Sequence, residues 1–254
     1  MKLVDADGYV YNKIITNLDL SKLDTEDMDS MSRMFKGFSS IVELDLSRFN
    51  TDEVTDMQYM FAYCKALTAL DLSSFNTSEV TSMLAMFKEC KALTSLDLSS
   101  FNTSNVSNMA GMFNNCESIT SLDLSSFDTS NVNNMIAMFN FCKNIIKLDL
   151  SNFNTDKVTN MDGMFNYCKN IIKLDLSNFN TNKVTTMAYM FCNCLSLIEI
   201  IGTLDLTSCT NVYKMFKNCY ELKGVHLKNV PRTLDFTYIG GTEGVTYIID
   251  NYID

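Results

Sequence analysis

The sequence has little of what linkers, membrane spans and export signals are made from. It contains one proline, Pro231, and nine glycines, too few to build a flexible linker, so we expect no internal domain boundary. No apolar run approaches the ~18 residues that a membrane-spanning helix needs, so we expect no membrane insertion. The first residues include Asp5, Asp7 and Gly8 where a secretory signal would have its apolar centre, so we expect no leader in this chain.

Basic residues are also scarce. The chain has 20 Lys and Arg against 30 Asp and Glu, which gives a net charge of −10. Nucleic acids and anionic membrane surfaces attract proteins with basic patches. The charge therefore argues against both as partners.

The residues of catalytic and metal centres are nearly absent. The only histidine is His226, so no nucleophile–base pair can be assembled around an imidazole. There is no glycine-rich nucleotide motif, no HExxH, no GxSxG and no CxxC pair. We therefore expect no enzyme, no zinc site and no cofactor.

A 26-residue repeat fills most of the chain. The triplet Leu-Asp-Leu recurs in steps of 26, beginning at Leu18, Leu44, Leu70, Leu96, Leu122, Leu148 and Leu174. Two less regular copies follow, with Ile200 and Val225 in the first Leu position. A fixed period between 20 and 50 residues indicates a solenoid, in which each unit buries its apolar face against its neighbours.

The copy Leu67 to Cys90 serves as the template of the repeat. Leu67, Leu70 and Leu72 form the LxxLxL pattern of a leucine-rich repeat strand. Side chains alternate along a strand, so Asp71 is expected to point outward. Stacked strands of this kind predict a parallel β-sheet with one exposed face.

The second half of the repeat has helical spacing. Val80, Met83, Met86, Phe87 and Cys90 stand at i, i+3, i+6, i+7 and i+10, which predicts one face of a short helix. Because helices pack more widely (~8–10 Å) than strands (~4.8 Å), the stack should curve. We thus predict an α/β fold: a right-handed leucine-rich-repeat solenoid, curved as a horseshoe, with the parallel sheet concave and the helices convex.

Further columns of identical residues follow from the repeat. The phenylalanines at the strand-to-helix corner should stack as an aromatic spine, and the threonines beside them should cap the helices. The phenylalanine column is Phe49, Phe75, Phe101, Phe127, Phe153 and Phe179. The threonine column is Thr51, Thr77, Thr103, Thr129, Thr155 and Thr181.

Seven of the nine cysteines occupy one column of the repeat. We expect them to be reduced, buried thiols that pack as small apolar side chains. Disulfides between neighbouring turns are the alternative, since ~5–6 Å spacing would permit them. The column is Cys64, Cys90, Cys116, Cys142, Cys168, Cys194 and Cys219.

The ends of the array differ from its middle, as the caps of a solenoid should. Residues 1–17 are expected to form an N-terminal cap with a short strand. About eight repeats span residues 18–227. Residues 228–254 are expected to form a C-terminal cap with a turn at Gly240–Gly241. The whole is predicted to be a single domain.

The strongest candidate for a binding site is a row of carboxylates on the strand face. Adjacent members ~5 Å apart would repel by roughly 0.8 kcal/mol even in water. A cationic partner would explain the row, and a bridging divalent cation is a weaker possibility. Hydrogen bonds from the neighbouring serines, or protection of a flat sheet against self-association, would explain it without a ligand. The candidate binding residues are Asp45, Asp71, Asp97, Asp123, Asp149 and Asp175.

Two smaller groups are secondary candidates. Lys147 and Lys173 precede Asp149 and Asp175 by two residues, so they should share the strand face with them. Apolar residues also stand just before the cysteine column, where other repeats are polar. These are Tyr63, Phe141 and Tyr167, and they could form a small contact patch.

The stretch LDLSSFNTSNVSNMAGMFNNCESITSLDLSSFDTSNVNNM, from Leu96 to Met135, resembles the BspA-like leucine-rich repeat family. Units of that family are also catalogued as a mycoplasma domain of unknown function. The resemblance covers residues 18 to about 227 and implies a bacterial surface or secreted protein that adheres to host proteins. A structural spacer that displays other domains is the alternative, as is an intracellular interaction scaffold, because the chain lacks an export signal.

Overall fold

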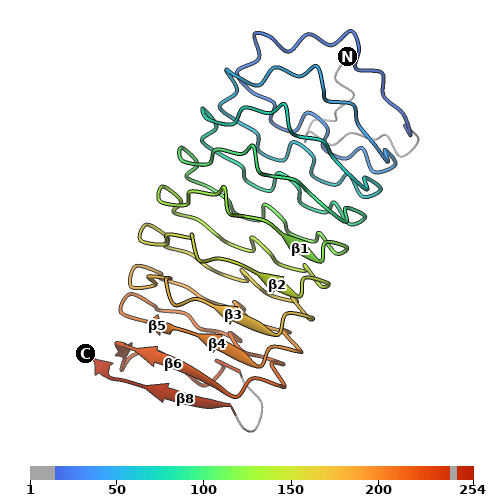
Figure 1. Cartoon of the computed structure of the whole chain (residues 1–254). Coiled ribbons are helices and arrows are strands. Elements are labelled where there is room, and N and C mark those ends of the chain that lie inside the picture. Colours follow the sequence, from blue (N-terminus) through green and yellow to red (C-terminus); the bar gives the residue numbers. More distant parts are fainter. Residues whose placement is uncertain (1–14, 241–244) are drawn as a thin grey trace.

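The computed structural model describes residues 15–240 and 245–254. Figure 1 shows the chain as a stack of similar coils that runs from the N-terminal to the C-terminal end. Most of the predicted N-terminal cap, with its short strand, lies outside the described residues, as does Gly241 of the predicted C-terminal turn.

The regular strands are short, and all of their pairings are parallel. They form four small sheets, in the orders β1-β2, β3-β4, β5-β6-β8 and β7-β9. Their bounds are β1 Ser121–Leu122, β2 Lys147–Leu148, β3 Lys173–Asp175, β4 Glu199–Ile201, β5 Thr203–Asp205, β6 Gly224–Lys228, β7 Val230–Pro231, β8 Thr246–Ile249 and β9 Tyr252–Ile253.

The predicted strands of the repeat are confirmed in β1 to β4. Leu122 pairs with Leu148, and Leu174 pairs with Ile200, so the register equals the 26-residue period. Leu122 is buried and Asp123 is exposed. This alternation fixes the register, because a slip by one residue would turn the leucines outward and the aspartates inward.

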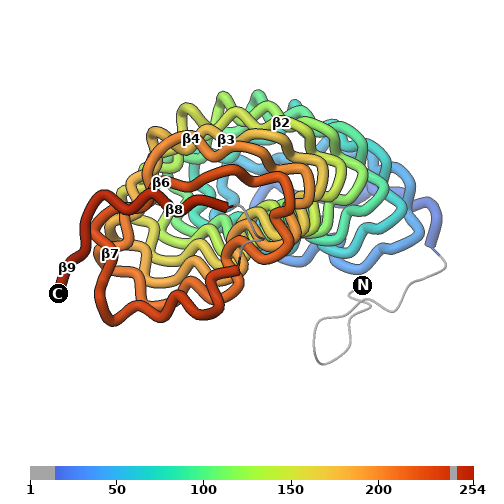
Figure 2. Tube along the Cα trace, turned by 90° about the horizontal axis from the view of Figure 1, so that it is seen from below, coloured from blue at the N-terminus to red at the C-terminus, as the bar shows by residue number. Residues whose placement is uncertain are grey.

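A second line of parallel pairing runs along the other side of each coil. Seven bridges connect eight equivalent residues in succession, and Figure 2 shows the coils overlapping along the stack. The bridged residues are Ser30, Asp56, Ser82, Asn108, Asn134, Asn160, Thr186 and Asn211.

The predicted convex helices are wrong: the described residues contain no helix. Residues 84–89 form a run of consecutive turns instead. The N–H groups of Met86 and Lys88 donate to carbonyls three residues earlier, whereas a helix would use carbonyls four residues earlier. The N–H groups of Met83, Ala85 and Phe87 donate to the next coil, at 2.8–3.1 Å.

The apolar spacing predicted the buried face correctly and its backbone wrongly. Met83, Met86, Phe87 and Cys90 are all fully buried, as an amphipathic helix would have them. The run of turns achieves the same burial because every repeat has a left-handed residue at two positions four residues apart, such as Ala85 (φ 53°) and Glu89 (φ 64°). Left-handed residues end α-helices.

The small residues on this segment have a related role. Gly111 and Gly163 occupy the same left-handed position as Ala85, with φ of 61° and 60°. Glycine reaches such angles without strain. The side chain of the bridged Asn108 also accepts the N–H of Ala110 at 3.0 Å, a local turn bond that competes with helix formation.

Strong curvature was expected because helices pack more widely than strands, and without helices this cause is absent. On the turn side, successive rings of one phenylalanine column stack with centroids 5.4–5.8 Å apart. That spacing is much closer to the ~4.8 Å between strands than to the ~8–10 Å between helices. Both sides of the coil therefore advance at similar rates, and the horseshoe with its concave sheet loses the basis on which it was predicted.

The aromatic spine exists, but in a different column from the one predicted. It follows the methionines, and its rings lie within 2–9° of parallel. The corner phenylalanines are buried, yet among the described residues only Phe153 and Phe179 stack on each other, at 6.4 Å. The stacked column is Phe35, Phe61, Phe87, Phe113, Phe139, Phe165, Phe191 and Phe216.

The cysteines are free and buried, as expected. Each thiol of the column donates to the carbonyl of the stacked phenylalanine in the preceding coil, as Cys142 does to Phe113 at 3.1 Å. Burial raises the pKa of the Cys142 thiol to about 12. The column therefore consists of neutral thiols that form part of the core.

The corner threonines link the coils, a role that was not predicted. The hydroxyl of Thr103, fully buried, donates to the carbonyl of Asp128 and accepts the N–H of the same residue, both at 2.9 Å. The same exchange recurs from Thr51 to Thr181. One hydroxyl thus satisfies the N–H and the carbonyl that a neighbouring strand would otherwise bond.

The repeat changes near its C-terminal end. A further Leu-Asp-Leu at 204–206 begins in β5, where Leu204 pairs with Leu227 of β6. Its Asp205 lies at the corner: the Asp205 carbonyl accepts the hydroxyl of Thr181, and the Asp205 N–H donates to that hydroxyl. Leu206 therefore stands where a threonine stood. Beyond it, β8 adds to β6, with Leu227 beside Ile249, so the C-terminal segment continues the stack.

Candidate binding surface

The predicted carboxylates form an exposed row on the strand face. Each accepts the backbone N–H of the serine two residues later, at 2.9–3.1 Å. The serine hydroxyl donates at short distance to Asp45, at 2.7 Å, and to Asp71, at 2.6 Å. The serine bonds expected from the sequence are therefore present, and they hold each carboxylate in one orientation.

These hydrogen bonds also keep the row ionised. The serine hydroxyl, followed by the serine N–H, lowers the pKa of each carboxyl below 3.8. Repulsion from Asp123 and Asp71 acts in the opposite direction on Asp97 but does not reverse the shift. The row thus carries full negative charge at neutral pH.

Lys147 and Lys173 lie on the strand face, in β2 and β3. Lys173 forms an ion pair with Glu199 across the β3–β4 pair at 2.9 Å, and Lys147 helps to lower the pKa of Asp149. An open depression of about 320 Å³ lies here, lined among others by Lys147, Asp149 and Asp175. The face is therefore acidic toward the N-terminal end and of mixed charge from Lys147 onward.

Sequence reasoning missed a row of exposed isoleucines at the start of these strands. Ile146, Ile172 and Ile198 are 53%, 48% and 39% exposed, in three successive coils. The signal was present, because earlier repeats have Thr94 and Thr120 at this position. Exposed aliphatic side chains beside charged ones are typical of protein interfaces.

The secondary aromatic candidates do not join the strand face. Tyr63, Phe141 and Tyr167 lie on the run of turns, all with left-handed backbones (φ 59–67°). Phe141 and Tyr167 stack at 4.2 Å. Lys143 and Lys169 lie 5.7 and 5.8 Å from the centroids of these two rings. The structure thus separates the predicted site into an acidic strand face and an aromatic, lysine-bearing turn face.

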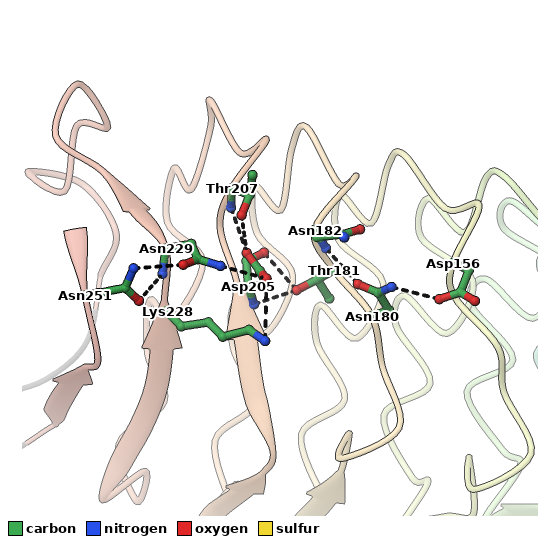
Figure 3. Close-up of polar contacts among 9 residues, drawn as sticks. All are labelled: Asp156, Asn180, Thr181, Asn182, Asp205, Thr207, Lys228, Asn229 and Asn251. Atoms are coloured by element: carbon green, nitrogen blue, oxygen red, sulfur yellow. Dashed lines mark hydrogen bonds and ion pairs between the residues drawn. The ribbon is translucent and has the colours of Figure 1, made fainter. Parts of the chain in front are cut away.

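The least exposed carboxylate among the described residues belongs to the frame of the protein. Figure 3 shows Asp205 between Thr181, Thr207, Lys228 and Asn229. One carboxylate oxygen accepts the hydroxyl of Thr207 at 2.6 Å, and the other lies 3.0 Å from the Asn229 amide nitrogen. Burial opposes ionisation, but these bonds outweigh it and keep the pKa below 3.8. Asp205 has its partners within the chain and is no free binding group.

Within the described ranges, no group of three or more His, Cys, Asp or Glu is placed to hold a metal ion. His226 is exposed on β6 and pairs in register with Thr203 and Ile248. No helix long and apolar enough to cross a bilayer occurs in the part of the chain that the structure describes.

A family model described as "Mycoplasma protein of unknown function, DUF285" matches the chain twice, over residues 7–122 and 111–229. Together these matches span almost all of the repeat array. None of the curated proteins searched matches the sequence.

Solved leucine-rich repeat proteins are among the structural matches. A T. pallidum leucine-rich repeat protein (TpLRR) is 15% identical over 76% of this chain and 70% of its own, with a TM-score of 0.40. A leucine-rich cell surface protein of Faecalibacterium prausnitzii is 14% identical over 87% and 76%, with a TM-score of 0.30. A leucine-rich repeat protein of Bacteroides ovatus is 13% identical over 88% and 86%, with a TM-score of 0.23.

Proposed function

The chain belongs to the DUF285 family of mycoplasma proteins, and from that membership we propose that it is a non-enzymatic protein-binding module of a bacterial surface. It engages a partner protein through the strand face. The observation that carries this proposal is the row of oriented, ionised carboxylates, repeated once per coil. A surface that repeats at strand spacing suits an extended partner segment lying along it.

The partner would contact more than charge. Toward β2, β3 and β4 the carboxylates adjoin the exposed Ile146, Ile172 and Ile198. Protein interfaces usually have apolar side chains at their centre and charged side chains at their edge. We therefore expect the partner to extend from Asp71, Asp97 and Asp123 to these isoleucines. A host extracellular protein, bound in adhesion, is the partner class that the family resemblance favours.

The test is binding of the purified chain to a panel of host extracellular proteins, with Asp71, Asp97 and Asp123 changed to asparagine. Asparagine keeps the oxygen that accepts the serine N–H, so the fold should persist. We expect at least tenfold weaker binding, because carboxylates that complement a basic partner are lost. The matched control removes three charges elsewhere, at the exposed Asp52, Glu79 and Asp156. Equal binding by both triple variants would exclude the strand face.

A structural spacer is the second candidate. The continuous threonine and phenylalanine columns favour it, because they make each coil a rigid copy of the last. A spacer would bind none of the panel, and shortening the array would change only the distance that it spans. Surface display is tested separately by protease treatment of intact cells, which should degrade a displayed chain and spare an internal one.

A further inference from the structure

Three tyrosines from successive coils gather on the turn face near the C-terminal end. Tyr189, Tyr213 and Tyr238 are 38%, 37% and 59% exposed; we refer to them as the tyrosine patch. Tyr189 and Tyr213 meet edge to face at 5.4 Å, and Tyr213 and Tyr238 are tilted at 5.8 Å. Unlike the parallel rings of the buried spine, these rings lie at large angles to one another, 78° and 57°.

Two lysines accompany the tyrosine patch. The Lys214 ammonium lies 4.6 Å from the Tyr213 ring centroid and 5.9 Å from that of Tyr189, and Lys217 is exposed. Burial raises the pKa of the Cys192 thiol, and the charges of both lysines oppose this increase, so both lie near Cys192. Among the ion pairs of the described residues, neither lysine takes part. On a chain of net charge −10, this is a local cationic surface.

The nearby Asp162 does not neutralise this surface by pairing with the lysines. One of its carboxylate oxygens accepts the Ala188 N–H at 2.7 Å and the Thr186 hydroxyl. Asp162 is therefore tied into the backbone of the neighbouring coil.

Tyr189 and Lys214 occupy the first of the two left-handed positions that each coil contains. Both are left-handed, with φ of 58° and 53°, at the position that Gly111 and Gly163 occupy in other coils. A bulky side chain there is strained, and exposed side chains recover little of that strain through burial. Arg33 and Tyr59 have large side chains at the same left-handed position in other coils, so the tyrosine patch is distinguished by its exposed rings and ammonium groups and not by its backbone.

We propose that the tyrosine patch with Lys214 and Lys217 binds an acidic, extended segment of a partner protein. Tyrosine gives large contact area at low conformational cost and is enriched where binding energy concentrates. The two ammonium groups have no ion-pair partner among the described residues, so they supply the complementary charge for carboxylates. This surface lies apart from the strand face, so the two can be occupied independently and by segments of opposite charge.

The test is calorimetric titration of the full chain with a ten-residue glutamate peptide, with ten-residue lysine and oligothymidine probes in parallel. We expect saturable binding of the glutamate peptide that weakens as salt is added. The variants Lys214→Gly and Tyr213→Ser should each weaken it at least fivefold. Lys214→Gly should not lower the melting temperature, because glycine relieves the left-handed strain.

Variants of the strand face separate this proposal from the proposed function. Asp71, Asp97 and Asp123 changed to asparagine should leave glutamate-peptide binding undiminished. Absence of saturable binding, equal binding by the Lys214→Gly and wild-type chains, or tighter binding of oligothymidine than of the peptide would each overturn the acidic-segment proposal. None of these results bears on the strand face.

Discussion

The buried threonine hydroxyls are the residues on which the stacking of coils depends most directly. Thr103 satisfies both the N–H and the carbonyl of Asp128, at a corner where no strand neighbour does so. A buried backbone group that loses its partner costs ~1–3 kcal/mol. The column therefore contributes through two hydrogen bonds per residue, and its methyl groups pack beside them.

The variant Thr103→Val tests this role. Valine has the same shape without the hydroxyl, so two backbone groups lose their partner, and the free energy of unfolding should fall by about 2–4 kcal/mol. Thr103→Ser is the control: it keeps the hydroxyl and should cost only about 1 kcal/mol for the lost methyl group. Urea denaturation measures both. Equal losses would assign the effect to packing.

The aspartate row makes stability depend on pH. The pKa of Asp71 and its equivalents is lower in the folded chain than the usual 3.8. Such groups stabilise the fold at pH above 3.8, and this contribution disappears as the pH falls through the lower folded value. Unfolding midpoints should therefore drop as the pH falls below 3.8.

A variant with all six aspartates of the row changed to asparagine should lose most of this acid sensitivity, and Asp205, whose pKa is also lowered, should keep the rest. Asparagine still accepts the serine N–H, but it does not titrate. Denaturation midpoints at pH 7 and pH 3 measure the difference between the two chains. A drop as large in the variant as in the wild type would place the acid-sensitive groups elsewhere.

The run of turns is the element that sequence reasoning misjudged. The leucine strands, the buried methionines and cysteines and the exposed aspartates could all be predicted, because burial alone decides them. The backbone of residues 83–90 could not, because the i, i+3, i+7 spacing describes which residues are buried and not which carbonyls the N–H groups reach. Gly111 and Gly163, which stand at the left-handed position, were the available signal.

The candidate site also has a part that could be predicted from the sequence and a part that could not. The strand side of Asp71, Lys147 and Lys173 follows from alternation along a strand, so it was predictable. The place of Tyr63, Phe141 and Tyr167 depends on left-handed turns, which no periodicity reveals. The tyrosine patch was missed for that reason, and also because Tyr238 comes from the segment expected to be a cap.

Substitution at a left-handed position tests the turn run directly. Ala137 has φ of 53°, so Ala137→Gly should raise the free energy of unfolding by about 0.5–1 kcal/mol, because the strain relieved exceeds the added backbone entropy. Ala110 has no positive φ, so Ala110→Gly should lower it by about as much. Thermal denaturation compares the two. Destabilisation by both variants would favour a helical backbone at this segment.

For the whole molecule, the common register of every column makes a coil an interchangeable unit. Deletion of residues 97–122 joins Leu96 to Asp123 and restores the Leu-Asp-Leu strand. The shortened chain should fold with an unchanged circular dichroism spectrum per residue and a modestly lower melting temperature, since each unit contacts only its neighbours. Deletion of residues 97–109 alone should prevent folding, because it breaks every column at once.

Because the coils are nearly identical, a folding chain can pair a coil with more than one partner. A corner threonine normally bonds to the next coil, about 26 residues away, but the coil after that offers the same backbone groups and stacked rings. A misfolded pairing that skips one coil would therefore lose the contacts of the skipped coil and few others. At Leu204 and Leu206, leucines replace the repeated phenylalanine and threonine, so this coil cannot form the threonine bonds of a mispaired partner. We expect this irregular coil to fix the register of the coils that pair with it, because only one alignment suits it.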